Sequence, residues 1–248
     1  MSRVVMMERA PRRSERFVYW LSRHWLLAFN LAWGTFVVLP WLAPLLMQVG
    51  ATGPANAVYF VYQFFCHQLP ERSFFLFGSQ PMYSLDQIGA VWNTADPNLL
   101  RQFVGHSDFG FKVAYSDRMV AMYTAFWFAA MAFGLLRHRL RPLPLWAYVL
   151  MILPMAVDGG THFLSDLEGI DQGFRITNQW LAQLTNHALP ASFYAGNALG
   201  SFNSWARLVT GALFGLASAW LMLPYVEAAF FEAREELERK FGAALKTA

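Results

Sequence analysis

Hydrophobic residues are grouped along this chain into a few long runs that charged residues do not interrupt. No Lys, Arg, Asp or Glu occurs in residues 25–50, 119–136, 143–157 and 208–224. A helix needs about 20 mostly apolar residues, within a range of about 17–25, to cross a hydrocarbon layer about 30 Å thick. The pattern therefore predicts four transmembrane helices, over residues 25–48, 118–136, 143–164 and 204–224.

A shorter apolar run, residues 57–66, ends too early to cross the membrane, because polar residues and Pro70 follow it. We expect residues 57–78 to form a re-entrant or interfacial helix-turn-helix on the outer side, although a span is also open. Two polar segments, 79–117 and 165–203, are predicted to be long loops on that same side. Together these features predict an all-α membrane protein with a transmembrane helical domain over residues 25–224.

The two ends of the chain differ from this domain. Residues 1–24 are basic and are expected on the cytoplasmic side. Residues 225–248 have apolar positions at helical spacing and Glu and Arg or Lys four residues apart, which is typical of an amphipathic helix. This cytoplasmic helix either lies on the membrane or its own protein, or it binds a partner.

Composition supports a membrane location. The chain is 56% hydrophobic, 17% aromatic and 14% charged, whereas a soluble domain carries roughly 25% charged residues. The net charge of +3 does not indicate nucleic-acid binding, because the basic residues sort by membrane side and form no single patch. The single cysteine excludes an internal disulfide.

The distribution of basic residues predicts the orientation. With four spans and a cytoplasmic N-terminus, 13 of the 19 Lys and Arg residues lie inside and six lie outside or at the outer membrane border. An excess of positive charge inside is the usual arrangement. We therefore expect a bacterial inner-membrane protein with both termini in the cytoplasm.

Candidate chemistry comes from polar residues at membrane depth, because a charge at the bilayer centre costs about 2.5–3.5 kcal/mol on insertion scales. Cys66 and His67 are adjacent in the sequence "QFFCHQLPERSFFLFG" and resemble a metal or nucleophile site. Neighbours on a helix point about 100° apart, so the two side chains need not converge. The plainer interpretation is a buried, inert thiol beside an interfacial imidazole.

A second group lies in "VDGGTHFLSD". Asp158, His162 and Asp166 follow each other at four-residue spacing and share one helix face if the two glycines do not break the helix. Carboxylates and an imidazole on one face are suited to a divalent metal such as Zn, Mn or Fe. The alternative is a helix end at which polar residues meet water, and on that interpretation we expect no cofactor.

Arg118 and Arg207 begin the second and fourth predicted spans, near the level of Asp158. A salt bridge that joins the helices is the plain interpretation, and a clamp for an anionic substrate is the other. The expected buried polar network contains these residues: Cys66, His67, Gln68, Arg72, Arg118, Tyr123, Asp158, Asn203 and Arg207. Small residues at Gly211, Gly215 and Ala219 are predicted to let another helix approach closely.

Four motifs in order resemble a bacterial membrane-protein family, domain of unknown function 2085. They are "CHQLPERSFFLFG", an Arg-x4-Tyr helix start, "DGGTH" and "NSWARLVTGALFG", and the resemblance covers about residues 57–220. The resemblance carries over the following residues: Cys66, His67, Gln68, Arg72, Ser73, Arg118, Tyr123, Asp158, Gly159, Asn203, Arg207, Thr210 and Gly211. It implies no particular activity.

This chain departs from the family pattern at the thiols. Where the family has Cys-x-Arg-Cys, the chain has Ser116 and Met119 around Arg118, and His162 stands in place of Gln. A site of several thiolates, which the family pattern implies, therefore cannot operate unchanged here.

These observations favour a non-catalytic accessory subunit or assembly protein of a larger membrane complex, in contact with lipid and with other membrane subunits. The alternative is a membrane-embedded metal- or thiol-dependent enzyme that uses Cys66, His67, Asp158 and His162. A transporter ranks third, because no inverted repeat is visible.

The orientation leads to a labelling test. A cysteine introduced at Asn98 is expected to react with an impermeant thiol reagent in intact cells, and one at Ser14 is expected to stay unlabelled until the cells are opened. The unaltered chain gives the background of Cys66. The reverse labelling pattern would contradict the predicted orientation.

Overall fold

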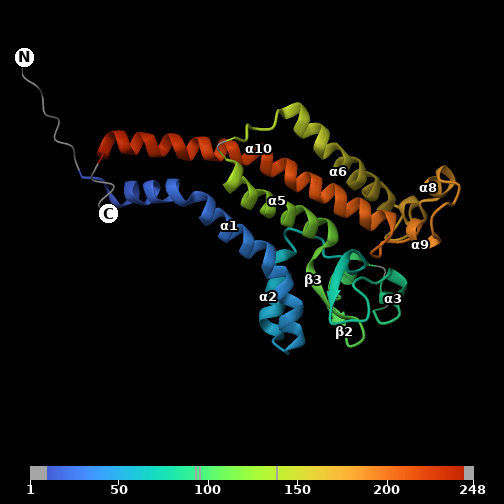
Figure 1. The fold of residues 1–248 in the computed structure, drawn as a ribbon. Coiled ribbons are helices and arrows are strands. Elements are labelled where there is room, and N and C mark those ends of the chain that lie inside the picture. The colour runs from blue at the N-terminus through green and yellow to red at the C-terminus, as the bar shows by residue number, and fades with distance from the viewer. Residues whose placement is uncertain (1–9, 93, 95, 138, 243–248) are drawn as a thin grey trace, which may run out of the picture.

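The computed structural model describes residues 10–92, 94, 96–137 and 139–242. Figure 1 shows a bundle of long helices with a small sheet at one end, which is called the sheet end below. In chain order the elements are α1 (Arg13–Gln48), α2 (Thr52–Tyr62), η1 (Pro70–Arg72), β1 (Ser73–Leu76), α3 (Leu85–Gly89), α4 (Pro97–Leu100), β2 (Gly105–His106), β3 (Gly110–Ser116), α5 (Asp117–Leu136), α6 (Leu145–Asp166), α7 (Phe174–Thr177), α8 (Gln179–Leu184), α9 (Ala191–Tyr194) and α10 (Phe202–Phe241).

Four helices of the described residues are long and apolar enough to cross a membrane: α1, α5, α6 and α10. The predicted all-α membrane architecture is therefore confirmed. Helices α5 and α6 have 20 and 22 residues, or about 30 Å each at 1.5 Å per residue, which matches the hydrocarbon layer. Helix α2 has 11 residues and is too short to span.

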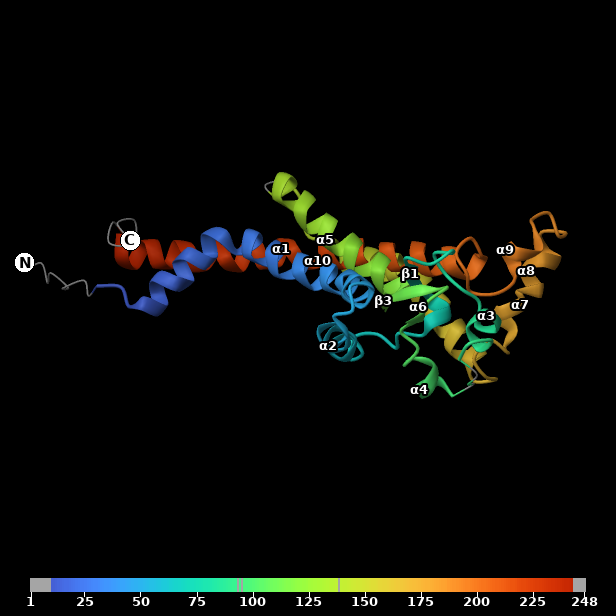
Figure 2. The same ribbon diagram turned by 90° about the horizontal axis from the view of Figure 1, so that it is seen from below.

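Helix α1 is longer than the sequence suggested. It begins at Arg13, so half of the segment 1–24, expected as a terminus outside the bundle, is helical. The Glu15 carboxylate accepts a hydrogen bond from the backbone N–H of Arg12 at 2.7 Å and caps the start. With 36 residues in α1 and 40 in α10, both helices exceed the hydrocarbon thickness. Figure 2 shows their far ends side by side, beyond the other helices.

Helix α10 also corrects the expectation of a separate helix over residues 225–248. It continues without a break from the span, and the last six residues lie outside the described part. Its polar face contacts α1, because Trp25 Nε1 donates to Glu227 at 2.8 Å and the Tyr19 hydroxyl donates to Glu238 at 3.0 Å. The amphipathic pattern therefore reflects packing within the chain.

The segment 79–117, expected as a polar loop, contains two short helices and two strands. The strand order is β1-β3-β2, with both pairs antiparallel. Ser73 pairs with Ser116 and Phe75 with Lys112, with an irregularity between the two pairs. A separate apolar cluster supports the sheet and consists of Phe75, Tyr83, Ile88, Leu100 and Phe103. In the sequence, the alternation of apolar and polar residues in these short strands was too brief to distinguish the strands from a loop.

Helix α10 packs most closely on α5, through the small residues singled out in the sequence. A Cβ atom added at Gly215 would lie 2.2 Å from the carbonyl oxygen of Met122, and one at Gly211 would lie 2.7 Å from that of Arg118. Ala219 continues this stripe into a core with Phe126 and Phe133. The helix that approaches the stripe is therefore a neighbour within the chain.

Gly215→Ala is expected to lower thermal stability, because the methyl group would overlap the α5 backbone. Overpacking of this kind costs on the order of 1–3 kcal/mol. The intrinsic tryptophan fluorescence of the protein in detergent, followed on heating, measures the effect.

Gly160→Ala is the matched control. It also lies in a membrane helix, but an added Cβ meets nothing within 4 Å there, so only the higher helix propensity of Ala operates. Equal melting temperatures for the two variants would contradict the close packing of α10 on α5.

Candidate functional site

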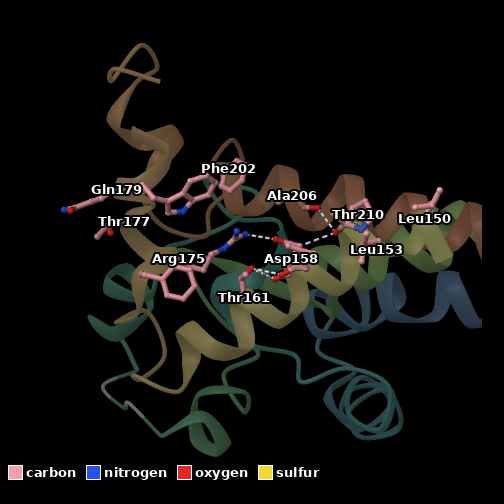
Figure 3. Close-up of a pocket in the computed structure, with 14 residues that line it drawn as sticks. Leu150, Leu153, Asp158, Thr161, Arg175, Thr177, Gln179, Phe202, Ala206 and Thr210 are labelled. Carbon is pink, nitrogen blue, oxygen red and sulfur yellow. Dashed lines mark hydrogen bonds and ion pairs between the residues drawn. The ribbon is translucent and has the colours of Figure 1, made fainter. Parts of the chain in front are cut away.

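The polar residues gather near the sheet end of the bundle, where α6, α7 and the start of α10 meet. A cavity of about 960 Å³ opens beside them, with Leu150 towards one end and Gln179 towards the other (Figure 3). Asp158 and Arg175 provide its charged part. This location makes the residues around Asp158 the candidate site.

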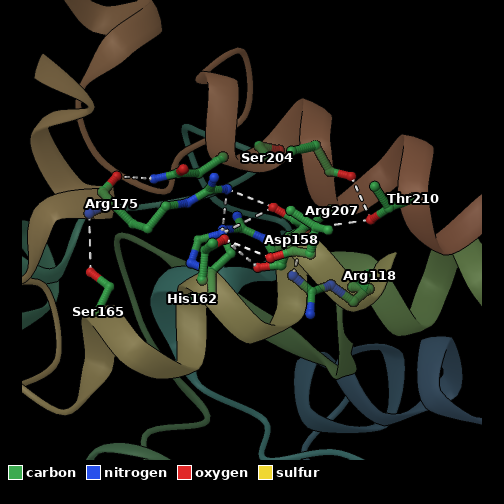
Figure 4. Close-up of polar contacts among 12 residues, drawn as sticks. Arg118, Asp158, His162, Ser165, Arg175, Ser204, Arg207 and Thr210 are labelled. Carbon is green, nitrogen blue, oxygen red and sulfur yellow. Dashed lines mark hydrogen bonds and ion pairs between the residues drawn. The ribbon is translucent and has the colours of Figure 1, made fainter. Parts of the chain in front are cut away.

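Asp158 is buried in α6 and neutralises side chains from two other elements (Figure 4). Arg118 Nη2 of α5 donates to Oδ2 at 2.7 Å, and Arg175 Nη2 of α7 donates to Oδ1 at 2.6 Å. The hydroxyl of Thr210 on α10 lies 3.4 Å from Oδ2. One carboxylate therefore joins four elements and accepts hydrogen bonds from two guanidinium groups. Arg175 was not among the expected site residues, because it lies in a segment without a motif.

The "DGGTH" motif acquires a physical reason here. A Cβ atom at Gly159 would lie 3.2 Å from Arg118 Nη1, so the glycine leaves space for that guanidinium. One turn later, His162 Nε2 is 3.1 Å from Arg175 Nη2. A guanidinium can only donate, so Nε2 accepts and the imidazole carries its proton on Nδ1. His162 thus serves as a neutral acceptor in this arrangement.

Arg207 forms a second buried ion pair. It was expected to join Arg118 at Asp158, but its Nε donates to both oxygens of Asp117, at 2.8 and 2.9 Å. Its other nitrogens donate to the side-chain and backbone oxygens of Asn197, at 2.7 and 2.8 Å. Asp117 directly precedes Arg118. The first turn of α5 therefore provides a carboxylate for Arg207 of α10 and a guanidinium group for Asp158 of α6. The predicted network left Asp117 out.

Two asparagines attach the segment after α6, residues 167–201, to α10 through hydrogen bonds. Asn203 Nδ2 donates to the carbonyl oxygens of Arg175 at 2.6 Å and Gly196 at 2.9 Å. Asn178 donates to the Asn203 side chain at 3.2 Å and adopts a φ of 41°, a left-handed conformation that Asn tolerates better than most residues. These bonds hold the Arg175 backbone, and therefore its guanidinium, in place.

The proposed metal ligands do not converge. Asp166 accepts two hydrogen bonds from Arg72, at 2.9 and 2.7 Å, and Asp158 is occupied by arginines. His162 Nε2 lies 3.7 Å from Asp158 Oδ1. Within the described part of the chain, no group of three or more His, Cys, Asp and Glu side chains is placed to hold a metal ion. The four-residue spacing placed the three residues on one face, but arginines from other elements decide their contacts.

Cys66 lies beside a separate, smaller cavity of about 70 Å³. Its Sγ is 3.4 Å from the Ser116 hydroxyl and accepts the backbone N–H of Ser116 at 3.3 Å. Ser116 and Met119, the two positions at which the sequence resemblance implied cysteines, both line this cavity, as do the guanidinium-bearing residues Arg118 and Arg207. Cys66 and these two positions therefore meet at one place.

Three other expected network residues lie apart from Asp158. His67 is exposed at the small cavity. Gln68 is buried, and its Nε2 donates to the carbonyl oxygen of Tyr59 at 2.9 Å. Tyr123 packs in an aromatic cluster, with its ring centroid 5.9 Å from that of Trp33. The residues expected to form a single network thus form two separate groups. One group consists of ion pairs near α6, and the other consists of local contacts near α2 and the start of α5.

Two buried charged residues outside the spans were not part of the expected network. Lys112 Nζ donates to the carbonyl oxygens of Gln68 at 2.7 Å and Arg101 at 2.6 Å. Burial lowers the pKa of Lys112 to about 7 and raises the pKa of Glu71 to about 7. Glu71 Oε1 lies 3.5 Å from Arg72 Nε, which is too poorly aligned for a hydrogen bond. Lys112 belongs to β3 and Glu71 to η1, and neither residue lines the large or the small cavity.

The fold and the buried ion pairs define a multi-pass α-helical membrane protein. Residues 108–221 match the model of a family described as predicted membrane protein (DUF2085), so the resemblance seen in the sequence is confirmed over these residues. The match includes Arg118, Asp158, Asn203 and Arg207. No curated protein and no solved structure matches the chain.

Asp158→Asn is expected to lower the yield of folded protein sharply, because Arg118 and Arg175 would lose their carboxylate. Breaking a buried ion pair costs about 3–5 kcal/mol. Gel filtration of the detergent-solubilised protein and its melting temperature measure the loss.

Two substitutions serve as controls. Asp108→Asn removes a carboxylate that is 80% exposed and belongs to a weak pair with His106, and Cys66→Ser keeps a hydrogen-bonding group beside Ser116. Both are expected to keep the yield nearly unchanged. A stable Asp158→Asn variant with wild-type yield would show that the ion pairs do not hold the bundle together.

Proposed function

We propose that this integral membrane protein is a non-catalytic accessory subunit or assembly protein of a larger membrane complex. The observation that carries the proposal is the internal use of its charges. Asp158, Asp117 and Asp166 each bind arginines of the same chain. A carboxylate whose oxygens accept hydrogen bonds from guanidinium groups of the same chain is not free to bind a substrate or a metal ion.

The arrangement of the alternative site residues supports the same conclusion. An enzyme that used Cys66, His67, Asp158 and His162 together would need them around one cavity. Cys66 and His67 line the small cavity and Asp158 lines the large one, while His162 lines neither. Arg118 contacts Asp158 and also lines the small cavity, so it lies between the two groups.

The paired far ends of α1 and α10 are the surface that we assign to a partner. A helix of 40 residues is about 60 Å long, roughly twice the hydrocarbon thickness, so this pair extends beyond the membrane. In the proposed inner-membrane orientation it lies in the cytoplasm with both termini. Phe231 on α10 is exposed there, and aromatic side chains are enriched in contacts between proteins.

The experiment is purification in mild detergent, followed by the native mass of the complex and metal analysis of the same sample. We expect a stoichiometric protein partner that is lost from Phe231→Ser. Phe128→Ser, at an exposed position within the α5 span, is the matched control and is expected to keep the partner. A chain that purifies alone with one transition metal, and loses the metal in Cys66→Ser, would overturn the proposal in favour of the enzyme.

A further inference from the structure

The large cavity is an amphipathic groove along α6. Leu150, Leu153, Pro154 and Val157 line it at the spacing of one helix face, and Ala206 of α10 lies opposite. The side chains of Leu150, Leu153 and Val157 are about half exposed, so this part of the groove is open to the hydrocarbon layer. Its volume, about 960 Å³, lies at the upper end of the roughly 300–1,000 Å³ usual for ligand sites.

The other end of the groove is polar and contains the guanidinium group of Arg175. This group shares the carboxylate of Asp158 with Arg118, which does not line the groove. One carboxylate thus accepts hydrogen bonds from two guanidinium groups. Arg175 lines the groove, is almost fully buried, and has a buried Nε atom without a hydrogen-bond partner among the described residues. A buried charge of this kind favours an anionic partner.

Further groups at this end suit a head group. Thr177 and Gln179 line the groove next to Arg175 and are exposed, and Figure 3 shows both labelled side chains beyond Arg175, on the side away from Leu150. Trp180 and Phe202 stack edge to face at 6.0 Å beside them. Aromatic side chains commonly lie at the boundary between hydrocarbon and water. The groove thus changes from apolar to polar along its length, as a bilayer leaflet does.

We propose that the groove between α6, α7–α8 and α10 binds one anionic glycerophospholipid, with its phosphate near Arg175 and Gln179 and one acyl chain along Leu150 and Val157. The guanidinium group of Arg175, which shares its carboxylate with Arg118, favours a lipid with an anionic head group, because basic pockets between membrane helices bind such head groups. A helix of a partner subunit would fill only the apolar part of the groove and would leave Nε of Arg175 without a hydrogen-bond partner. A free phosphate would leave the apolar part empty.

The test uses the full-length protein, freed of lipid in detergent, and native mass spectrometry with phosphatidylglycerol or phosphatidylcholine of the same acyl chains. We expect one bound phosphatidylglycerol, held about tenfold more tightly than phosphatidylcholine. Glycerol phosphate, which has the head group without the acyl chains, is expected to compete poorly. Equal affinity for the two lipids, or full competition by glycerol phosphate, would overturn the proposal.

Two pairs of variants separate the apolar and polar parts of the groove. Ala206→Trp fills the apolar part and is expected to lower binding of both lipids about tenfold, whereas Ala156→Trp, exposed on α6 outside the groove, is expected to bind normally. Gln179→Glu adds a negative charge at the polar end and is expected to abolish the preference for phosphatidylglycerol. Gln183→Glu adds the same charge on α8 outside the groove and is expected to keep that preference.

Gln179 is exposed, and its side chain forms no hydrogen bond or ion pair with another described residue, so its variant tests the proposal even where Ala206→Trp fails to fold. An unchanged lipid preference in Gln179→Glu would contradict the assigned position of the head group. A native complex in which a protein partner covers the groove and no lipid is bound there would show that a subunit, and not a lipid, occupies the groove. The lipid measurement does not depend on the partner sought above, because it is made on the isolated chain.

Discussion

Asp158 has to be neutralised inside this protein, because a buried carboxylate that has lost its water is stable only with a partner. The bundle provides Arg118 from α5 and Arg175 from α7, and neither arginine has another carboxylate within hydrogen-bond distance among the described residues. The position of α6 relative to α5 and α7 therefore depends on these two bonds. Lipid tails are as apolar as the side chains of α6, so apolar contacts alone give little preference for one arrangement of the helices over another. An ion pair, in contrast, forms only when the helices that carry its two partners face each other.

The second ion pair extends this constraint to α10. Arg207 binds Asp117 at the residue before Arg118, so the first turn of α5 is attached to α10 by one side chain and to α6 by the next. One and two turns after Arg207 along α10, Gly211 and Gly215 bring the backbones of α5 and α10 together. Close packing along the stripe and two ion pairs at its end leave few ways to assemble the four spans.

The two cavities explain why the polar residues look like an enzyme site in the sequence. Around Cys66, Ser116 and Met119 stand where the sequence resemblance implied cysteines, and they line one small cavity with the thiol. Around Asp158, the carboxylate and the imidazole are bound to arginines. The contacts of these residues are those of a structural junction, with a groove of about 960 Å³ beside it.

The sequence by itself determined the four spans, because length and apolar composition decide what a bilayer accepts. It also singled out Arg118, Asp158 and Arg207 as members of a polar network. Only the tertiary structure decided that Arg207 binds Asp117, that Arg72 binds Asp166, and that Arg175 of the short helix α7 binds Asp158. The helical period gives the face of a side chain, but the partner depends on which helix lies opposite. The sheet of residues 73–76, 105–106 and 110–116 and the continuous α10 escaped prediction for the same reason, since contacts between distant segments stabilise both.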